Sequence, residues 1–300
     1  MAPLPDDWDL DLDNPQGGAG DLTDSLSHAA VLMRRDPLRH GNVVHLPAQG
    51  DAVILGDLHG DVENFARVVK WAALHRNRDR YLVLQELIHG GPLDGDGCDD
   101  SFRLLEQAAA LKVRYRSQVQ MVLSNHDLAE LVGVEVTKSG RPTAEPFHRG
   151  IEKAYGAAAP TVLGAYRTFL VSLPLDVRTP NGVFISHSTP DHAAMETFDF
   201  GVFDQPIDLR NCGPGTSLYE LVWGRDYRQC CADKFAEAVG AEVLVTGHQT
   251  SMPGLKTPTT RHLVLTSDGP LGRFVVVPLA APVLPGPLAR QVRKVRSLEA

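Results

Sequence analysis

Five short apolar segments, each followed directly by an acidic, amide or imidazole side chain, constrain the fold of this chain more than any other feature. Ala52–Leu55 runs into Asp57 and His59, and Tyr81–Leu84 runs into Glu86. The other three apolar segments end at Asn125 and His126, at His187, and at His248. Apolar runs of this length, bounded by turn residues, indicate buried strands. Because ligands of open α/β sheets bind beyond the carboxyl ends of the strands, we expect these side chains to converge.

The spacing between the first three strands predicts how they pair. Residues 62–75 carry apolar side chains at helical intervals, and so do residues 101–115, which precede the strand at 119–123. Connections of a dozen or more residues containing a helix are typical of parallel strands. Two consecutive units of this kind predict a parallel sheet with right-handed crossovers.

The second half of the chain has two hairpin patterns. Residues 169–177 and 183–187 flank a Thr-Pro-Asn-Gly turn, and residues 262–266 and 273–279 flank Ser-Asp-Gly-Pro. Turns of this composition between apolar segments favour antiparallel hairpins. We therefore predict two further pairs of adjacent strands.

Both ends of the chain differ in composition from the middle. Residues 1–22 are rich in Asp, Pro and Gly and are interpreted as a disordered tail. Residues 282–300 are first proline-rich and then basic, which we interpret as a C-terminal tail. The segment between them, 23–281, is predicted to be one domain of the 300-residue chain.

Overall composition excludes several classes of protein. A hydrophobic content of 43% with 22% charged residues is typical of a globular protein. The net charge of −8 argues against a nucleic-acid partner, and no apolar run approaches the ~20 residues that span a bilayer, so no membrane association is expected. The four cysteines form no Cys-x-x-Cys pair, and the acidic first residues do not resemble a secretory signal, so a cytoplasmic location is expected.

The residues after the strands form a donor set suited to metal ions. Taken singly, each has an ordinary alternative: Asp57 could form an Asx turn, Asn125 a turn, and His187 or His248 a half-buried core position. An ordered series of such groups, each after a strand, favours a common site. Oxygen and imidazole donors without thiolate suit Mn, Fe or Zn.

Six donors are too many for one catalytic ion that keeps an open position, and they suit two divalent ions. Paired ions lie ~3.5–4 Å apart and lower the pKa of a water between them, so that hydroxide becomes available as a nucleophile at neutral pH. They also neutralise charge on a phosphoryl group. The predicted assignment gives one ion Asp57 and His59, the other ion Asn125, His187 and His248, and both ions Glu86 as a bridge.

The series resembles the calcineurin-like metallophosphoesterase superfamily, in particular its branch related to serine/threonine protein phosphatases. The resemblance spans about residues 50 to 250 and rests on Gly56-Asp57-Leu58-His59-Gly60, Gln85-Glu86-Leu87-Ile88-His89-Gly90-Gly91, Ser124-Asn125-His126-Asp127, His187, and Gly247-His248-Gln249-Thr250. It implies a four-layer αββα sandwich of two mixed sheets flanked by helices. It also implies phosphorylated substrates and a general-acid role for His126, which would protonate the leaving-group oxygen.

The second motif departs from the family pattern at three positions. Glu86 stands where the family has its bridging Asp, His89 replaces the Asp that orients the catalytic His, and Gly90 replaces a phosphate-binding Arg. Another arginine would then have to bind the phosphate. Arg225 is the first candidate and Arg149 the second.

Two functions follow from these observations. The first is a dinuclear-metal phosphoesterase acting on phosphoproteins, nucleotides or small phosphoesters through a hydroxide that bridges the metals. The alternative is a degenerate member of the family that keeps the fold and the metal as a scaffold without turnover, which only the altered second motif favours.

Overall fold

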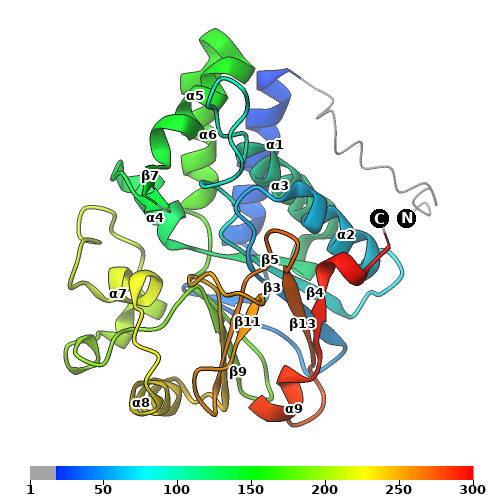
Figure 1. Ribbon diagram of the computed structural model, residues 1–300, viewed down its shortest axis with the longest axis vertical. Helices are drawn as coiled ribbons and strands as arrows, with labels where there is room; N and C mark the ends of the chain where they lie inside the picture. Colours follow the sequence, from blue (N-terminus) through cyan, green and yellow to red (C-terminus); the bar gives the residue numbers. More distant parts are fainter. Residues whose placement is uncertain (1–17, 139, 300) are drawn as a thin grey trace.

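The structure, a computed structural model, describes residues 18–138 and 140–299. Its helices are α1 (Ala19–Arg34), α2 (Val62–Ala72), α3 (Phe102–Tyr115), α4 (Asn125–Val132), α5 (Ala144–Tyr155), α6 (Ala159–Leu170), α7 (Ser217–Trp223), α8 (Gln229–Val239) and α9 (Pro285–Ala289). Helix α1 packs against both α3 and α6 (Figure 1). Among the described residues, no helix has the length and apolarity needed to cross a bilayer.

Two mixed sheets form the centre of the molecule. The five-stranded sheet has the order β14-β13-β3-β4-β5, and its strands are β3 (Asp51–Asp57), β4 (Arg80–Gln85), β5 (Val119–Val122), β13 (Arg273–Pro278) and β14 (Val292–Lys294). Strands β3, β4 and β5 are parallel, which confirms the two predicted crossovers.

The seven-stranded sheet has the order β1-β2-β8-β9-β10-β12-β11. Its strands are β1 (Arg39–His40), β2 (Val43–His45), β8 (Asp176–Arg178), β9 (Val183–Ser186), β10 (Val243–Thr246), β11 (Leu255–Lys256) and β12 (His262–Leu265). Strands β8 and β9 form the predicted antiparallel hairpin, but β8 begins at Asp176 and not at residue 169, because α6 extends to Leu170. Strands β9, β10 and β12 are parallel. A separate short hairpin joins β6 (Thr137–Lys138) to β7 (Arg141–Pro142).

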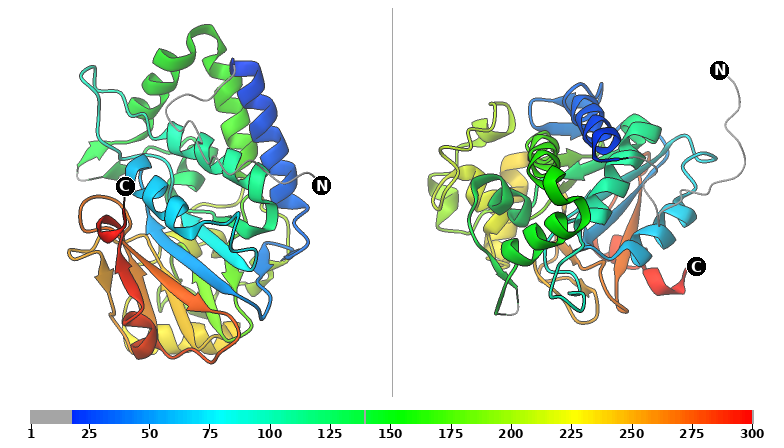
Figure 2. Two further views of the ribbon diagram at one scale, coloured as in Figure 1. Left: turned by 90° about the vertical axis from the view of Figure 1, so that its right-hand side faces the viewer. Right: turned by 90° about the horizontal axis from the view of Figure 1, so that it is seen from above.

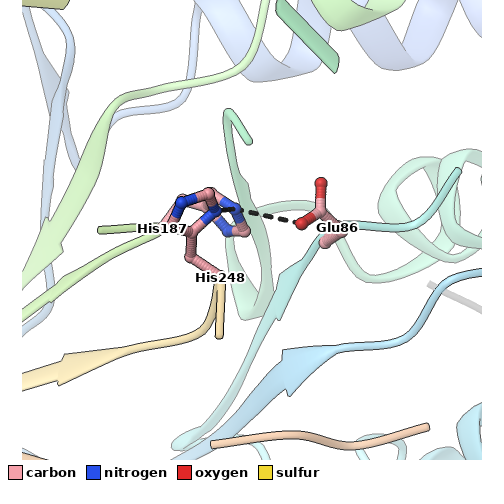
Figure 3. Close-up of side chains that lie close together, drawn as sticks. All are labelled: Glu86, His187 and His248. Carbon is pink, nitrogen blue, oxygen red and sulfur yellow. Dashed lines mark hydrogen bonds and ion pairs between the residues drawn. The ribbon is translucent and has the colours of Figure 1, made fainter. Parts of the chain in front are cut away.

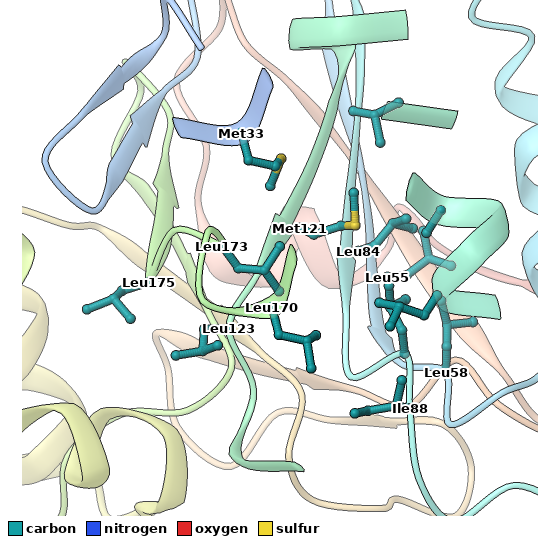
Figure 4. Packing of buried hydrophobic residues seen from close by; sticks show 14 of the residues in the cluster. Met33, Leu55, Leu58, Leu84, Ile88, Met121, Leu123, Leu170, Leu173 and Leu175 are labelled. Carbon is teal, nitrogen blue, oxygen red and sulfur yellow. The ribbon is translucent and has the colours of Figure 1, made fainter. Parts of the chain in front are cut away.

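The central strands are apolar on both faces. One face of each sheet packs against the other sheet, and the opposite face packs against helices. In β3, Ile54 belongs to a core cluster shared with strands of both sheets, whereas Val53 and Leu55 belong to a second cluster shared with the helices. In β10, Val245 and Leu244 divide in the same way. Figure 4 shows part of the second cluster, in which Leu55 and Leu84 meet residues from the surrounding helices and loops.

Helices cover the outer faces of the sandwich. Helices α2 and α3 lie over the five-stranded sheet, and α8 lies over the seven-stranded sheet (Figures 1 and 2). The resulting helix–sheet–sheet–helix order confirms the predicted αββα sandwich.

The prediction of a hairpin at residues 262–279 is wrong. Strand β12 pairs in parallel with β10 in the seven-stranded sheet, and β13 pairs antiparallel with β3 in the five-stranded sheet. Their inner faces, including Leu263 and Val275, pack against each other across the sandwich. A turn between two apolar strands can join neighbours within one sheet or lead the chain from one sheet to the other. The second arrangement is the observed one, because it buries the inner faces of both strands between the sheets.

Both predicted tails are shorter than expected where the structure describes them. Helix α1 begins at Ala19, inside the segment assigned to the N-terminal tail, and residues 1–17 of that tail lie outside the described residues. The C-terminal segment contributes α9 and the edge strand β14, and its Val295 is fully buried. The domain therefore extends past residue 281, because this segment covers apolar surface of the five-stranded sheet.

Candidate metal and active site

The six predicted metal ligands meet where the two sheets present the carboxyl ends of their central strands. Asp57 is the last residue of β3 and Asn125 the first of α4, yet both lie beside groups that follow β9 and β10. The Asn125 Oδ1 atom is 2.7 Å from His187 Nε2 and 2.9 Å from His248 Nδ1. The backbone N–H of His248 donates to Asp57 Oδ1 at 2.7 Å. All six side chains are buried.

Backbone conformation fixes several of these groups in unusual positions. His59, Glu86, His89 and His248 have φ values of 43°, 46°, 65° and 68°, in the left-handed region that side-chain-bearing residues rarely adopt. Strain of this kind costs about 1–3 kcal/mol per residue and clusters at functional sites. Four such residues beyond the carboxyl ends of the central strands therefore mark this end of the sheets as the functional region.

Gly247 shows how closely the motifs approach one another. A Cβ atom at this position would lie 2.1 Å from Asp57 Oδ1. Only glycine leaves room for the Asp57 carboxylate to accept the hydrogen bond from the next residue, His248.

Two groups of donor atoms share one carboxylate. Asp57, His59 and Glu86 each offer an atom within 4.8 Å of the others, and so do Glu86, His187 and His248. Figure 3 shows Glu86 facing the two histidines, with its Oε2 atom 3.0 Å from His187 Nε2. Glu86 therefore lies between the two groups, in the position expected of a bridging ligand.

The histidine tautomers suit metal binding. His59 Nδ1 donates to the carbonyl oxygen of His89 at 2.8 Å, and His248 Nε2 donates to the carbonyl oxygen of Trp223 at 3.2 Å. Each bond leaves the other ring nitrogen unprotonated within its donor group, which is the usual arrangement of metal-binding histidines. His187 Nε2 and His248 Nδ1 face each other at 3.2 Å beside Asn125 Oδ1, so electron-rich atoms converge on one point. The residues present thus fit a pair of divalent cations.

Burial and mutual charge perturb the ionisation of these groups. Burial, together with the charge of Glu86, raises the pKa of Asp57. Burial also acts to raise the pKa of Glu86, but His187 and His126 outweigh it and the pKa falls well below its usual value. Burial lowers the pKa of His59 to about 3 and that of His248 well below its ordinary value. His59 and His248 are therefore neutral, the form in which an imidazole coordinates a metal. Burial acts to lower the pKa of His187, but the charge of Glu86 outweighs it and raises that pKa.

His126 lies beside this donor set and leads to a second line of buried groups. Its Nδ1 atom is 3.3 Å from His89 Nδ1, and His89 Nε2 is 3.5 Å from the carboxylate of Glu130. Glu130 is also held by His148 at 2.9 Å and Arg167 at 3.0 Å. Burial acts to raise the pKa of Glu130, but hydrogen bonds from His148 and His89 lower it to about 2, so Glu130 is ionised. The ionised Glu130 carboxylate is therefore connected to the His126 ring through His89.

A cavity of about 330 Å³ opens over the site. Its lining includes Arg225, whose Nη1 atom is 3.5 Å from the carbonyl oxygen of His248. Arg149 does not line it: this exposed side chain pairs with Glu145 at 3.1 Å and with the carbonyl oxygen of Asp96. The structure thus places only the first of the two candidate arginines at the site.

Sequence reasoning missed two features of the site. Glu130 lies one helical turn after His126, an i,i+4 spacing that was available as a signal. Lys138 also lines the cavity, but it belongs to a polar segment whose hairpin has no motif that could be recognised.

Comparisons with known proteins agree with this geometry. The calcineurin-like phosphoesterase family model matches residues 52–252. A probable serine/threonine-protein phosphatase of Encephalitozoon cuniculi is 20% identical over 72% of this chain, and this chain spans about half, 46%, of that relative's length.

Solved structures show the same fold. A serine/threonine phosphatase from Saccharomyces cerevisiae has a TM-score of 0.65 at 13% identity, covering 90% of this chain and 86% of its own. A cold-active protein-tyrosine phosphatase from a psychrophilic Shewanella has a TM-score of 0.52 at 11% identity, covering 83% and 80%. With the family model matching most of the chain and all its motif positions meeting at one sheet edge, this chain belongs to the calcineurin-like phosphoesterase family.

Proposed function

We propose that this protein is a metal-dependent hydrolase of phosphate monoesters with two divalent cations at its site. The observation that carries this proposal is Glu86, which is shared by two donor groups drawn from both sheets. Asp57 and His59 would hold one cation, and Asn125, His187 and His248 the other. When bound, such cations neutralise phosphoryl charge and lower the pKa of water to near neutrality.

His126 is the proposed proton donor to the leaving group. It lines the cavity, and its backbone N–H donates to Glu86 Oε1 at 3.3 Å, which places the ring next to the bridging ligand. In one consistent set of tautomers, His126 donates from Nδ1 to His89 Nδ1, and the His89 Nε2 atom faces the Glu130 carboxylate at 3.5 Å. With both ring nitrogens protonated, His126 would hold on Nε2 the proton that it gives to the leaving-group oxygen, and it would keep the proton on Nδ1. The His89–Glu130 pair then orients the ring, a role that the family gives to an Asp.

Arg225 is the proposed phosphate ligand on one side of the cavity. Its guanidinium reaches the rim beside His248, where planar N–H donors can bind phosphoryl oxygens in pairs. Phosphorylated protein side chains are the first substrates to test, since the named relatives include serine/threonine and tyrosine phosphatases.

Hydrolysis of p-nitrophenyl phosphate tests the proposal. We expect turnover with added Mn²⁺, its loss in EDTA, and a fall of about 10²–10⁴-fold in His126→Ala, the usual contribution of a general acid. Binding of metal without turnover of phosphorylated peptides, nucleotides or small phosphoesters would instead support the scaffold alternative.

A further inference from the structure

One positively charged side chain reaches the site from a segment that the family motifs do not cover. Lys138, the last residue of β6, lines the cavity together with Asp57, His59 and His126. We propose that Lys138 binds the phosphoryl group of the substrate in place of the arginine that Gly90 lacks. This inference rests on the proposed phosphoesterase function and adds a residue that determines how the substrate binds.

The packing of Lys138 against Gly90 is the first support. A Cβ atom at Gly90 would lie 2.5 Å from Cδ of Lys138 and 3.4 Å from its Nζ. The aliphatic part of Lys138 therefore occupies the space that any side chain at position 90 would need. Lys138 thus packs in the space left by the missing side chain at position 90.

The ammonium group also keeps donors for a ligand. Its ion pair with Asp268 is 3.6 Å long, beyond hydrogen-bonding distance, and the Lys138 side chain is 24% exposed. Asp268 is itself fixed by its backbone N–H, which donates to the carbonyl oxygen of Asp57 at 2.9 Å. Asp268 thus holds Lys138 over the Asp57 end of the site without saturating it.

Lys138 and Arg225 come from different parts of the chain. Lys138 lies on the β6–β7 hairpin and Arg225 follows α7, and both line the same cavity. Two positively charged side chains lining one cavity suit the dianionic phosphoryl group of a monoester better than the single negative charge of a diester. The lysine should therefore contribute to the preference for monoesters.

The test compares Lys138→Met with Lys138→Arg and with Lys234→Met, which removes an exposed lysine from α8. Binding of inorganic phosphate to the Mn²⁺-supplied protein is measured by isothermal titration calorimetry, beside kcat and KM for p-nitrophenyl phosphate and bis-p-nitrophenyl phosphate. We expect Lys138→Met to weaken phosphate binding about tenfold and to reduce kcat/KM for the monoester more than for the diester. Lys138→Arg should recover most of the binding, and Lys234→Met should match wild type.

Gly90→Ala tests the same point without changing any charge. The added methyl group displaces the flexible Lys138 stem, so phosphate binding should weaken, and combining it with Lys138→Met should add nothing further. Wild-type phosphate affinity in Lys138→Met would overturn the inference even while the enzyme turns over. A wild-type protein that turns over no phosphoester would instead reject the proposed function, and the calorimetric comparison would still decide whether Lys138 binds phosphate.

Discussion

At the scale of single residues, the altered second motif is the feature that most needs explaining. Glu86 is one methylene longer than the Asp of the family, and its backbone is held at a φ of 46°. The side chain nevertheless ends between the two donor groups, 3.0 Å from His187. The left-handed backbone and the longer side chain together place a carboxylate where we propose that a bridging ligand lies.

Replacing Glu86 with Gln tests that position. The amide keeps the size but removes the charge that both cations share, so we expect at least one of two bound ions to be lost in elemental analysis of the Mn²⁺-supplied protein. Glu130→Gln is the matched control, because Glu130 is equally buried but belongs to neither donor group. Two ions per chain in Glu86→Gln would show that Glu86 does not bridge.

Glu130→Gln also tests the arrangement behind His126. If the His89–Glu130 pair orients His126, then the variant should lose more kcat for phenyl phosphate, a poor leaving group, than for p-nitrophenyl phosphate, with KM little changed. An equal loss for both substrates would mean that Glu130 is merely structural. In that case, Glu130→Gln and His126→Ala would also combine additively, whereas a shared role predicts that they do not.

At the scale of elements, Glu130 links three helices. It lies on α4, and its partners His148 and Arg167 lie on α5 and α6. The hydrogen bond with Glu130 raises the pKa of His148, outweighing the opposite effect of burial. Stability from this pair is therefore fully present below the unfolded pKa of His, about 6.5, and is lost as pH rises through the higher folded value.

The corresponding prediction concerns His148→Ala. Urea unfolding should show a larger loss of unfolding free energy at pH 6 than at pH 9, because only the protonated ring forms an ion pair with Glu130. A loss independent of pH would assign the effect to packing. His192→Ala, which removes a histidine far from Glu130 in sequence, controls for a general effect of losing an imidazole.

The C-terminal strand supplies a second test at this scale. Val295 follows β14 and is fully buried, so Val295→Ala should cost about 2 kcal/mol of unfolding free energy. Val292→Ala, on β14 itself but only partly buried, should cost less. Similar small losses in both would mean that this segment is not packed on the sheet in solution.

Individual elements differ in how far the sequence predicted them. Helix α3 and strand β5 match the predicted ranges 101–115 and 119–123 to within one residue, since a helical pattern and a short apolar run stand next to each other there. Helix α1 begins at Ala19, inside the predicted tail, and Ala19 and Leu22 of its first turns pack partly buried against the core. The pairing of β12 and β13 in different sheets depends on burial across the sandwich, which no turn pattern encodes.

At the scale of the whole molecule, the site exists only because two sheets pack face to face and bring the carboxyl ends of their central strands together. The hydrogen bond from His248 to Asp57 joins residues 191 positions apart, one from each sheet. Motif residues that follow strands could be predicted to meet because parallel strands end at one edge. The presence of Lys138 and Glu130 at the site could not be predicted in this way. Their positions depend on how a hairpin and a helix pack over the carboxyl ends of the strands.

The most direct test of this account is a crystal structure of the Mn²⁺-supplied protein with anomalous diffraction recorded at the manganese edge. The account predicts two peaks on opposite sides of the Glu86 carboxylate, one beside Asp57 and His59 and the other beside His187 and His248. A single peak, or two peaks that do not share Glu86, would contradict it.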